Sequence, residues 1–467
     1  MIPIPKAASS AQDHAVPWRA LAACAALALA LRTALYGGLD VYADEALYWW
    51  WSTDLAGGYF DHPPMVAWLH ALGFGHDGLR WPARLMGAGS VVVAGLLALR
   101  LGATRSGAIS ASLICAFAPM LAYTGGLALP DAPEELFASL ALLYLLTAQG
   151  RTWLLAGVFV GLGLLSKYTM GLWAFALIAM VPLDARLRAQ LKGAWPWLGW
   201  AVSLLVFAPC ALWNAQHDWV SFAFQFEHGV GQASTMRFAP EFWAAQVVGF
   251  GPFACILAWF GWRRLEPGSV RQRLLALVGV TLVLFLVLSL RGKQEANWAT
   301  FLFPALAALA GLGVSKARRW MVHASVVWGL LLMGFFGWQL RSPSVLSPNN
   351  PQIKRLHATS EISRRVEQVL GAPDDPLIWV SNYQLAAQLA YTNGWRRFGS
   401  SWARPSQISL KPAPGVPDAL VSYQPAPQAL LDEHGLERVG AADRIELARN
   451  GVKTHTVWVQ RVARKQP

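Results

Sequence analysis

Long apolar runs recur along most of the chain, and they constrain its fold more than any other feature. A helix of about 20 apolar residues crosses the ~30 Å of hydrocarbon in a bilayer, and the lipid leaves only helices or closed barrels as spanning structures. We therefore predict a polytopic α-helical membrane protein with about 11 transmembrane helices. The predicted spans are 18–36, 81–99, 107–127, 133–148, 153–166, 168–183, 195–213, 242–262, 274–290, 299–314 and 322–340.

Composition supports a membrane protein, since 55% of the residues are hydrophobic and only 14% are charged. The net charge of +12 would indicate nucleic acid in a soluble protein, but here the basic residues mark topology and no nucleic-acid partner is predicted. The four cysteines fall inside apolar runs, which indicates packing rather than a disulfide or zinc site. A cleaved signal peptide is the alternative for the first run. A retained helix is favoured, because many further spans follow.

The charges of the turns predict the orientation. Basic residues favour the cytoplasmic side, and they gather in every second turn: Arg100, Arg105, Arg151, Arg186, Arg188, Lys192, Arg263, Arg264, Arg271, Arg273, Lys316, Arg318 and Arg319. The opposite turns are acidic, with Asp44, Glu45, Asp54, Asp61, Asp77, Asp131, Glu134, Asp218, Glu227 and Glu295. We expect a cytoplasmic N-terminus and an acidic extracytoplasmic face.

The composition changes after residue 340, where Pro, Asn and Ser cluster and apolar runs of spanning length end. We predict two domains: 1–340, a transmembrane catalytic domain whose first extracytoplasmic loop is 37–81, and 341–467, a small soluble α/β domain on the extracytoplasmic side. In the second domain, periodicity predicts helices at 362–370 and 382–391. Strands are predicted at Leu377–Ser381, Ala419–Ser422 and Thr454–Val462.

The stretch Tyr42–Pro64, which follows the first span, is too acidic and aromatic for membrane core. Asp44 and Glu45 open it, and Asp61 and His62 lie near its end. A short helix between them carries an aromatic surface suited to a membrane interface. The plain alternative is a solvated loop anchored by tryptophans. We favour an acidic site at the bilayer surface, because such a loop does not need carboxylates at both ends.

Further polar groups from distant turns are predicted on the same face. The set comprises Asp131, Glu134, Glu135, Lys167, Tyr168, Asn214, His217, Asp218, Glu227, His228, Lys293, Gln294, Glu295, Asn297 and Trp298. Lys167 is the most informative, because a lysine between two apolar helices is costly unless it meets an anion or lines a polar cavity. Snorkelling to the interface is the plain alternative. Lys293 and Arg291 are placed similarly, which favours a phosphate ligand.

Together these motifs resemble a known family. They are Y-x-D-E-x-x-Y with G-Y-F-D-H-P-P, L-P-D-x-P, G-L-G-L-L-S-K-Y and K-Q-x-x-N-W-A. The pattern resembles the bacterial branch of the protein O-mannosyltransferase superfamily, GT-C fold glycosyltransferases similar also to the aminoarabinose transferases that modify lipid A. The resemblance implies a bacterial inner-membrane enzyme. It would transfer a sugar from a polyprenyl-phosphate-linked donor to a lipid, glycan or protein acceptor outside the cytoplasmic membrane.

The resemblance also implies roles for individual residues. Asp44 would be the catalytic base that takes the proton of the acceptor hydroxyl, and Glu45 would hold the acceptor or orient Asp44. The donor phosphate would meet Lys167, Lys293 and His62, since fixed cations stabilise the charge of the leaving group. Substrate contacts are expected from Asp61, Asp131, Tyr48, Tyr59, Tyr168, Gln294, Asn297 and Trp298.

One position departs from the lipid A relatives, which have E-K-P-P where this chain has Asp61-His62-Pro63-Pro64. The change removes a phosphate-binding lysine and indicates a different sugar or acceptor. A divalent ion bound by Asp61 with His62, or with His217 or His228, is one candidate reading. The alternative is that His62 donates to phosphate in place of the lysine, or that these histidines cap loops. No other cofactor is predicted.

A transporter or flippase of lipid-linked sugars is the competing function, because it would also need many spans and intramembrane charges. Inverted-repeat symmetry and matched broken helices, which mark many transporters, are not evident in the sequence. The polar groups are also predicted on one face rather than at mid-membrane. We therefore favour the glycosyltransferase.

Overall fold

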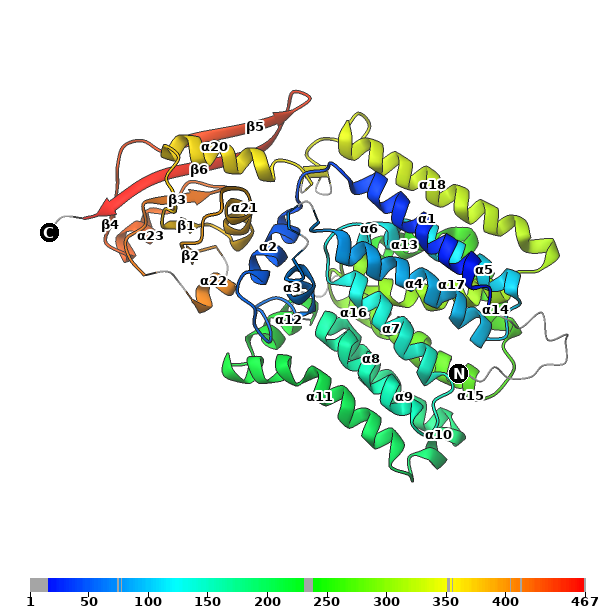
Figure 1. The fold of residues 1–467 in the computed structure, drawn as a ribbon. Coiled ribbons are helices and arrows are strands. Elements are labelled where there is room, and N and C mark those ends of the chain that lie inside the picture. The colour runs from blue at the N-terminus through cyan, green and yellow to red at the C-terminus, as the bar shows by residue number, and fades with distance from the viewer. Residues whose placement is uncertain are drawn as a thin grey trace.

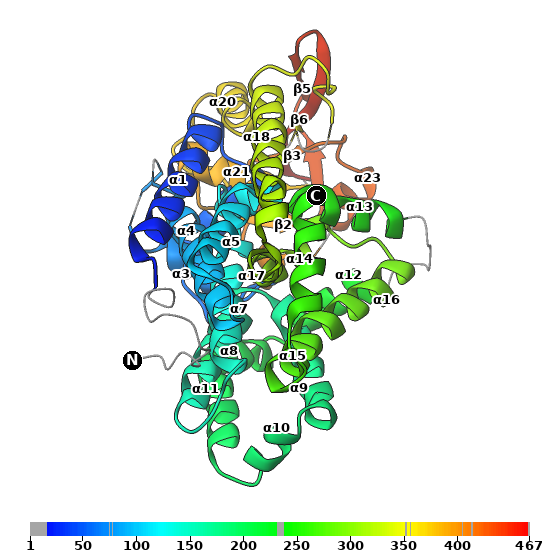
Figure 2. The ribbon, with the colours of Figure 1, turned by 90° about the vertical axis from the view of Figure 1, so that its right-hand side faces the viewer.

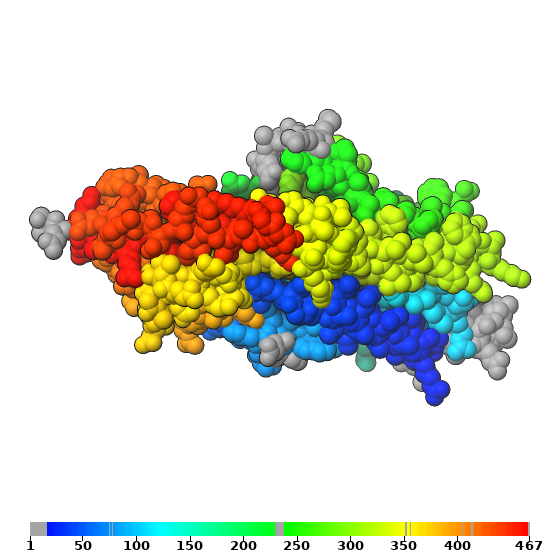
Figure 3. Space-filling view, turned by 90° about the horizontal axis from the view of Figure 1, so that it is seen from above, coloured from blue at the N-terminus to red at the C-terminus, as the bar shows by residue number. Residues whose placement is uncertain are grey.

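The computed structural model describes residues 16–465 except 74, 77, 231–237, 351–352, 355, 404 and 412–413. Long helices form an elongated bundle, and a small sheet domain lies at one end of it (Figure 1). Seen from above, the chain after residue 341 (yellow to red) makes one end of the molecule, while α1 (blue) and α18 (yellow-green) run along the other (Figure 3). The predicted polar start of the chain lies mostly outside the described residues.

The helical part contains, in order, α1 (Trp18–Tyr36), α2 (Ala43–Ser52), α3 (Met65–His70), α4 (Trp81–Arg100), α5 (Arg105–Phe117), α6 (Pro119–Thr124), α7 (Asp131–Leu145), α8 (Thr152–Ser166), η2 (Tyr168–Gly171), α9 (Leu172–Leu183), α10 (Ala185–Gln190), α11 (Trp195–Gln216), α12 (Val220–Val230), α13 (Ala239–Phe250), α14 (Pro252–Arg264), α15 (Ser269–Leu274), the π-helical η4 (Leu275–Val280), α16 (Thr281–Arg291), η5 (Ala296–Leu302), α17 (Phe303–Gly313), η6 (Lys316–Arg318) and α18 (Arg319–Arg341). Helix α17 packs among α4, α5 and α14 near the centre of the bundle (Figure 2).

Within the described residues, six helices are long and apolar enough to cross a membrane, and a bent pair raises the number to seven. The six are Trp18–Tyr36, Trp81–Arg100, Trp195–Gln216, Ser269–Arg291, Ala296–Gly313 and Lys316–Arg341. Each predicted span coincides with one or more helices. The predicted total of 11 crossings is not confirmed, because several of these helices are shorter than a bilayer is thick.

Proline and glycine explain why two predicted spans are broken. Ala118 is extended before Pro119, since a residue preceding proline avoids the helical region, and the span 107–127 divides there into α5 and α6. Gly251 has a φ of 108°, and α13 meets α14 at 86° beside Pro252. Lys167 is likewise extended, with φ −157°, and separates α8 from η2. A break inside an apolar run leaves backbone N–H and C=O groups without helical partners, and side chains can form hydrogen bonds with them.

The C-terminal part folds into a mixed sheet with helices beside it. Its elements are α20 (Thr359–Leu370), β1 (Ile378–Val380), α21 (Tyr383–Asn393), β2 (Phe398–Ser401), α22 (Gln407–Leu410), β3 (Ala419–Ser422), α23 (Gln428–Glu433), β4 (Leu436–Arg438), β5 (Asp443–Arg449) and β6 (Val452–Arg464). The strand order is β2-β1-β3-β6-β4, with β5 paired to β6. β1 is parallel to β2 and β3, whereas β6 is antiparallel to its three neighbours. This confirms the small domain with a sheet and the predicted strands at 377–381, 419–422 and 454–462.

The sheet domain is docked on the first loop of the helical part. Helix α2 packs against α21, and one apolar cluster includes Tyr48, Leu340, Ile353 and Val459. Polar contacts reinforce it: Ser360 donates through its Oγ to Asp40 at 2.7 Å, and the Phe60 N–H donates to Gln407 Oε1 at 2.9 Å. The division into 1–340 and 341–467 stays a prediction, because this core extends across residue 340.

Candidate functional site

Tyr48 lies on α2, close enough to three carboxylates for their charges to act on its hydroxyl. The ring is 5% exposed. Burial, followed by the charges of Asp44, Asp131 and Asp61, raises the pKa of the Tyr48 hydroxyl well above its ordinary value. Asp44 precedes Tyr48 by one helical turn, so both side chains lie on the same side of α2. The structure therefore brings four of the predicted site residues together.

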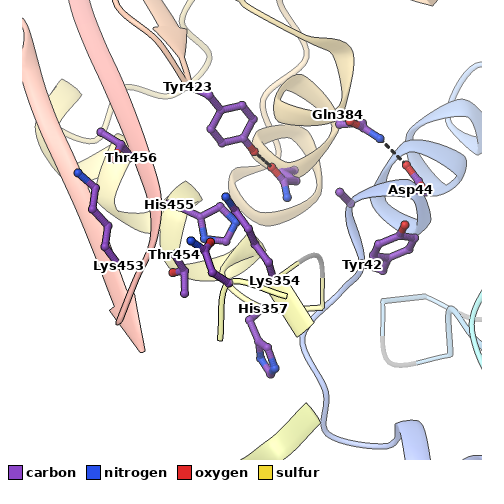
Figure 4. A pocket seen from close by; sticks show the side chains of 13 residues that line it. Tyr42, Asp44, Lys354, His357, Gln384, Tyr423, Lys453, Thr454, His455 and Thr456 are labelled. Carbon is purple, nitrogen blue, oxygen red and sulfur yellow. Dashed lines mark hydrogen bonds between the residues drawn. The ribbon is translucent and has the colours of Figure 1, made fainter. Parts of the chain in front are cut away.

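Asp44 is the half-buried carboxylate of this group that opens into a cavity. Its Oδ1 accepts a hydrogen bond of 2.6 Å from Gln384 Nε2 of α21, and it lines a cavity of about 750 Å³ between α2 and the sheet domain (Figure 4). In the part of the chain that the structure describes, no ion pair neutralises Asp44. An amide donor holds a carboxylate in place without cancelling its charge.

Glu45, the adjacent residue, is fully buried and bound on all sides. Arg80 donates from Nε to Oε1 at 2.8 Å and from Nη2 to Oε2 at 2.6 Å. The N–H groups of Ala128 and Tyr42 donate at 2.7 and 3.0 Å. Burial opposes ionisation of Glu45, but Arg80 and these hydrogen bonds outweigh it and lower the pKa of Glu45. This arrangement ties the start of α2 to the start of α4 and to the loop before α7.

Asp131 begins α7 and forms a second buried unit with Lys167. Lys167 Nζ donates to Asp131 Oδ1 at 2.6 Å, and Asn297 Nδ2 donates to the same oxygen at 2.8 Å. The two side chains of the ion pair are 6% and 2% exposed. An ammonium has three donors, so this hydrogen bond leaves Lys167 capacity for a further anion. The anion that Lys167 contacts in the structure is thus Asp131, a residue of the protein itself.

Two more carboxylates follow in the first turns of α7. Thr169 Oγ1 donates to Glu134 Oε1 at 2.5 Å, and Thr124 Oγ1 donates to Glu135 Oε1 at 2.6 Å. Both glutamates are fully buried. Hydroxyl donors of α6 and η2 therefore hold the acidic end of α7, and they connect it to the break at Lys167.

The D-H-P-P segment folds back onto α2. Tyr59 stacks on Trp51 with ring centroids 4.5 Å apart, and the ring of His62 lies edge-on to Tyr48 at 5.7 Å. Tyr59 is only 1% exposed. Its hydroxyl donates to Trp51 O at 3.0 Å. Tyr59 thus packs inside the loop, whereas His62 and Asp61 lie beside Tyr48.

The remaining predicted substrate residues, and the predicted phosphate-binding Lys293, have other partners in the structure. Tyr168 Oη lies 3.4 Å from Cys210 Sγ, toward α11. Gln294 is buried and donates to Leu288 O and Gly229 O, both at 3.3 Å. Lys293 is about half exposed and pairs with Glu295 at 3.0 Å. Trp298, next to Asn297, is partly buried and packs against the bundle core.

The candidate metal ligands that the structure describes do not form a group of three. Among the described residues, no three His, Cys, Asp or Glu side chains are grouped so that they could hold a metal ion. His217 stacks on Trp213 at 4.1 Å, and its Nδ1 lies 2.7 Å from Trp213 O. The side chain of His228 lies outside the described part of the chain.

Comparison with known proteins finds similarity to glycosyltransferases. A family model described as dolichyl-phosphate-mannose-protein mannosyltransferase matches residues 61–213. A lipid A galacturonosyltransferase, RgtD of Rhizobium johnstonii, is 28% identical over 384 residues, 76% of this chain and 78% of that protein. The chain is a membrane glycosyltransferase. Its predicted family resemblance is confirmed.

Solved structures show that this glycosyltransferase has the GT-C fold. ArnT from Cupriavidus metallidurans in the apo state matches with a TM-score of 0.64 and 17% identity, over 95% of this chain and 97% of that one. The same protein bound to undecaprenyl phosphate matches with a TM-score of 0.65 and 18% identity, over 95% and 98%. Because both sequence comparisons lead to transferases, the transporter alternative is not supported.

Sequence reasoning about the glycosyltransferase missed two residues that organise its site. Arg80 binds Glu45, and Gln384 of α21 binds Asp44. Arg80 carried a signal, because it is a basic residue in a loop whose other ionised residues are mostly acidic. Gln384 carried none, since an uncharged amide on a soluble helix is ordinary.

Proposed function

We propose that this glycosyltransferase transfers a sugar from a polyprenyl-phosphate-linked donor to a lipid acceptor. Two comparisons support the substrate classes: the ArnT structure is bound to undecaprenyl phosphate, and RgtD is a lipid A galacturonosyltransferase. A lipid donor reaches its enzyme from within the bilayer. A site at the junction of the apolar bundle and the polar sheet domain suits a substrate with a lipid chain and a polar head.

The observation that carries this proposal is the position of Asp44, at the boundary between the buried Tyr48 group and the 750 Å³ cavity. An acceptor hydroxyl in that cavity can reach a carboxylate that no cation neutralises among the described residues. Glu45 lacks this freedom, because Arg80 and two backbone N–H groups occupy its oxygens. We therefore assign the base to Asp44 and a positioning role to Glu45.

The reaction follows from these positions. The acceptor oxygen attacks the anomeric carbon of the donor while its proton passes to Asp44. The bond from the anomeric carbon to the phosphate oxygen breaks, and the polyprenyl phosphate leaves with that electron pair. Lys167 stabilises the charge on the leaving phosphate. Its buried ammonium fits this role better than Lys293, which is exposed and paired with Glu295.

Asp131, Asp61, Asn297 and His62 complete the proposed substrate contacts. Asp131 is held by Lys167 and Asn297 and lies beside Tyr48 with Asp61. Carboxylate and amide oxygens accept hydrogen bonds from sugar hydroxyls. His62 offers ring nitrogens near the same place, where it can donate to phosphate in place of a lysine.

We place the protein in a bacterial inner membrane with the site and the sheet domain outside. The basic turns at α10 and α15 lie at the end of the bundle opposite the sheet domain (Figure 1). Positive residues favour the cytoplasmic side. The acidic group around Tyr48 lies at the other end, next to the sheet domain.

Asp44→Asn tests the proposed base. The amide keeps the shape of the side chain but cannot take a proton, and positioned bases contribute about 100-fold to 10,000-fold in rate. We expect a loss of that size in the release of free polyprenyl phosphate from a sugar-linked donor, with donor binding retained. Asp54→Asn is the matched control, since Asp54 is a highly exposed carboxylate of the same loop. Near-normal turnover of Asp44→Asn at saturating substrates would contradict the assignment.

A further inference from the structure

The cavity next to Asp44 has an uneven distribution of charge. Asp44 and Gln384 lie on one side of it, while Lys354, His455 and Lys453 lie on the other (Figure 4). Asp44 is the one carboxylate among the described lining residues. Its volume of about 750 Å³ lies within the usual range for small-molecule sites, ~300–1,000 Å³. The cavity is therefore large enough for a sugar head group and has a basic wall opposite the base.

Lys354 is the cation of this wall that is available for a ligand. Within the described residues, no carboxylate lies within ion-pair distance of its ammonium. Lys453, by contrast, is about half exposed and paired with Glu446 at 2.5 Å. A lysine held at a cavity wall without an anion is suited to bind one.

Two imidazoles beside Lys354 have ring nitrogens without a partner. His455 Nδ1 and His357 Nε2 are buried and make no hydrogen bond within the described structure. Burial, and then the charge of Lys354, lower the pKa of His455 to about 4. Burial also lowers the pKa of His357 to about 4. Both rings are therefore uncharged near neutral pH. Buried polar atoms without partners are costly, and both histidines are among the residues that line the cavity.

The rest of the lining suits sugar hydroxyls. Tyr423 Oη donates to Gln388 Oε1 at 3.1 Å, and both residues line the cavity. Tyr423 is drawn in Figure 4. Hydroxyl and amide groups both donate and accept hydrogen bonds. The lining thus offers uncharged polar groups in addition to Lys354 and Asp44.

We propose that the cavity binds the acceptor as a phosphorylated sugar head, with the phosphate at Lys354 and His455 and the reacting hydroxyl at Asp44. This inference rests on the proposed function, since it assigns the acceptor to the same base. Phosphate is the anion that lysine commonly binds as a point charge. The phosphate stays intact: the bond that forms joins the acceptor hydroxyl oxygen to the donor sugar, and its proton goes to Asp44.

Binding of N-acetylglucosamine 1-phosphate to the purified full-length protein tests the proposal, with methyl N-acetylglucosaminide as the uncharged probe. We expect the sugar phosphate to bind at least about tenfold more tightly, because a charge-assisted hydrogen bond corresponds to that order of affinity. Lys354→Gln should remove most of this difference, and Lys354→Arg should restore it. Lys465→Gln is the matched control, because Lys465 is an exposed lysine of the same domain, paired with Asp432 away from the cavity. Thermal unfolding of each variant verifies that it is folded.

Several outcomes would overturn the inference. Equal affinity for the two probes, or equal losses in Lys354→Gln and Lys465→Gln, would show that no specific phosphate site exists. Competition by inorganic phosphate as strong as that by the sugar phosphate would indicate an anion site unrelated to the acceptor. If Asp44→Asn abolishes transfer while Lys354→Gln leaves both binding and transfer unchanged, the proposed function stands and this inference fails. If Asp44→Asn retains transfer, the proposed base is wrong whatever Lys354→Gln does.

Discussion

Asp44 and Glu45 show how two adjacent carboxylates acquire different properties. Successive residues of a helix differ by about 100° in direction, so α2 directs Glu45 toward Arg80 and Asp44 toward the sheet domain. Both carboxylate oxygens of Glu45 accept hydrogen bonds from the protein. The carboxylate of Asp44 keeps one face open to the cavity. The environment therefore decides which of the two is able to act on a substrate.

Glu45→Gln should destabilise the protein rather than alter its chemistry directly. Removing one partner of a buried ion pair costs about 3–5 kcal/mol, because the other charge stays buried without compensation. The folded-state pKa of Glu45 is lowered from 4.5. Its contribution to stability is therefore complete above that value and is lost as the pH falls through the folded-state pKa.

Thermal unfolding in detergent between pH 7 and pH 3 measures this effect. The wild-type protein should lose stability as the pH falls below about 4.5, the ordinary pKa from which Glu45 is displaced. In Glu45→Gln the loss over that interval should be smaller, while stability at pH 7 is already reduced. Parallel curves for the two proteins would contradict a structural role for the pair with Arg80.

Lys167 and Asp131 can be separated into a structural and a catalytic part by a double-mutant cycle. Lys167→Met and Asp131→Asn should each cost about 3–5 kcal/mol, since each leaves one buried charge alone. The double variant should cost less than the sum of the two. Its transfer activity should nevertheless stay low, because no cation is left for the donor phosphate. Recovery of both stability and transfer in the double variant would show that Lys167 only neutralises Asp131.

At the scale of elements, close helix contacts depend on glycine. A Cβ on Gly261 of α14 would lie 1.8 Å from Leu309 O of α17, and one on Gly313 would lie 2.0 Å from Leu257 O. Small residues let membrane helices approach this closely. The two helices thus share a contact at which a methyl group does not fit.

Gly261→Ala should therefore destabilise the bundle by about 1–3 kcal/mol or more, because the added methyl forces the backbones apart. Gly334→Ala is the matched control. Gly334 lies on α18, and a Cβ there would meet nothing within 4 Å. That variant should be neutral or more stable by up to about 1 kcal/mol, the difference in helix propensity. Melting temperatures in one detergent provide the comparison. Equal melting temperatures for the two variants would refute the close packing of α14 and α17.

The positions of the helices were predictable, whereas their lengths and breaks were less so. Apolar runs locate α1, α4 and α11 within a few residues, because the requirement for lipid burial acts on every residue of a span. The break at Pro119 and the bend at Gly251 depend on one residue each, and an apolar run conceals them. In the candidate site, too, some features were predictable from the sequence and others were not. The acidic positions were predictable from their cost in a membrane protein, but the partner Gln384 comes from another domain through tertiary contacts.

At the scale of the whole molecule, the sheet domain contributes residues to the candidate site. The cavity has walls from α2, α21 and β6, and Asp44 is held by the sheet domain through Gln384. Tyr48, Leu340 and Val459 belong to one apolar cluster, so the loop and the sheet domain bury surface against each other. A substrate with an apolar tail and a polar head would contact both parts at once. The orientation of the sheet domain relative to the membrane therefore decides on which side transfer occurs.

A reporter that is active only in the cytoplasm tests this orientation. The basic turns around α10 lie at the end of the bundle opposite β6 (Figure 1), and positive residues favour the cytoplasmic side. A fusion after Arg464 should therefore be silent, whereas a fusion after Gly193, in the turn between α10 and α11, should be active. A second reporter that is active only outside should give the reverse pattern. Strong cytoplasmic signal after Arg464 would place the cavity, Asp44 and the transfer reaction on the cytoplasmic side.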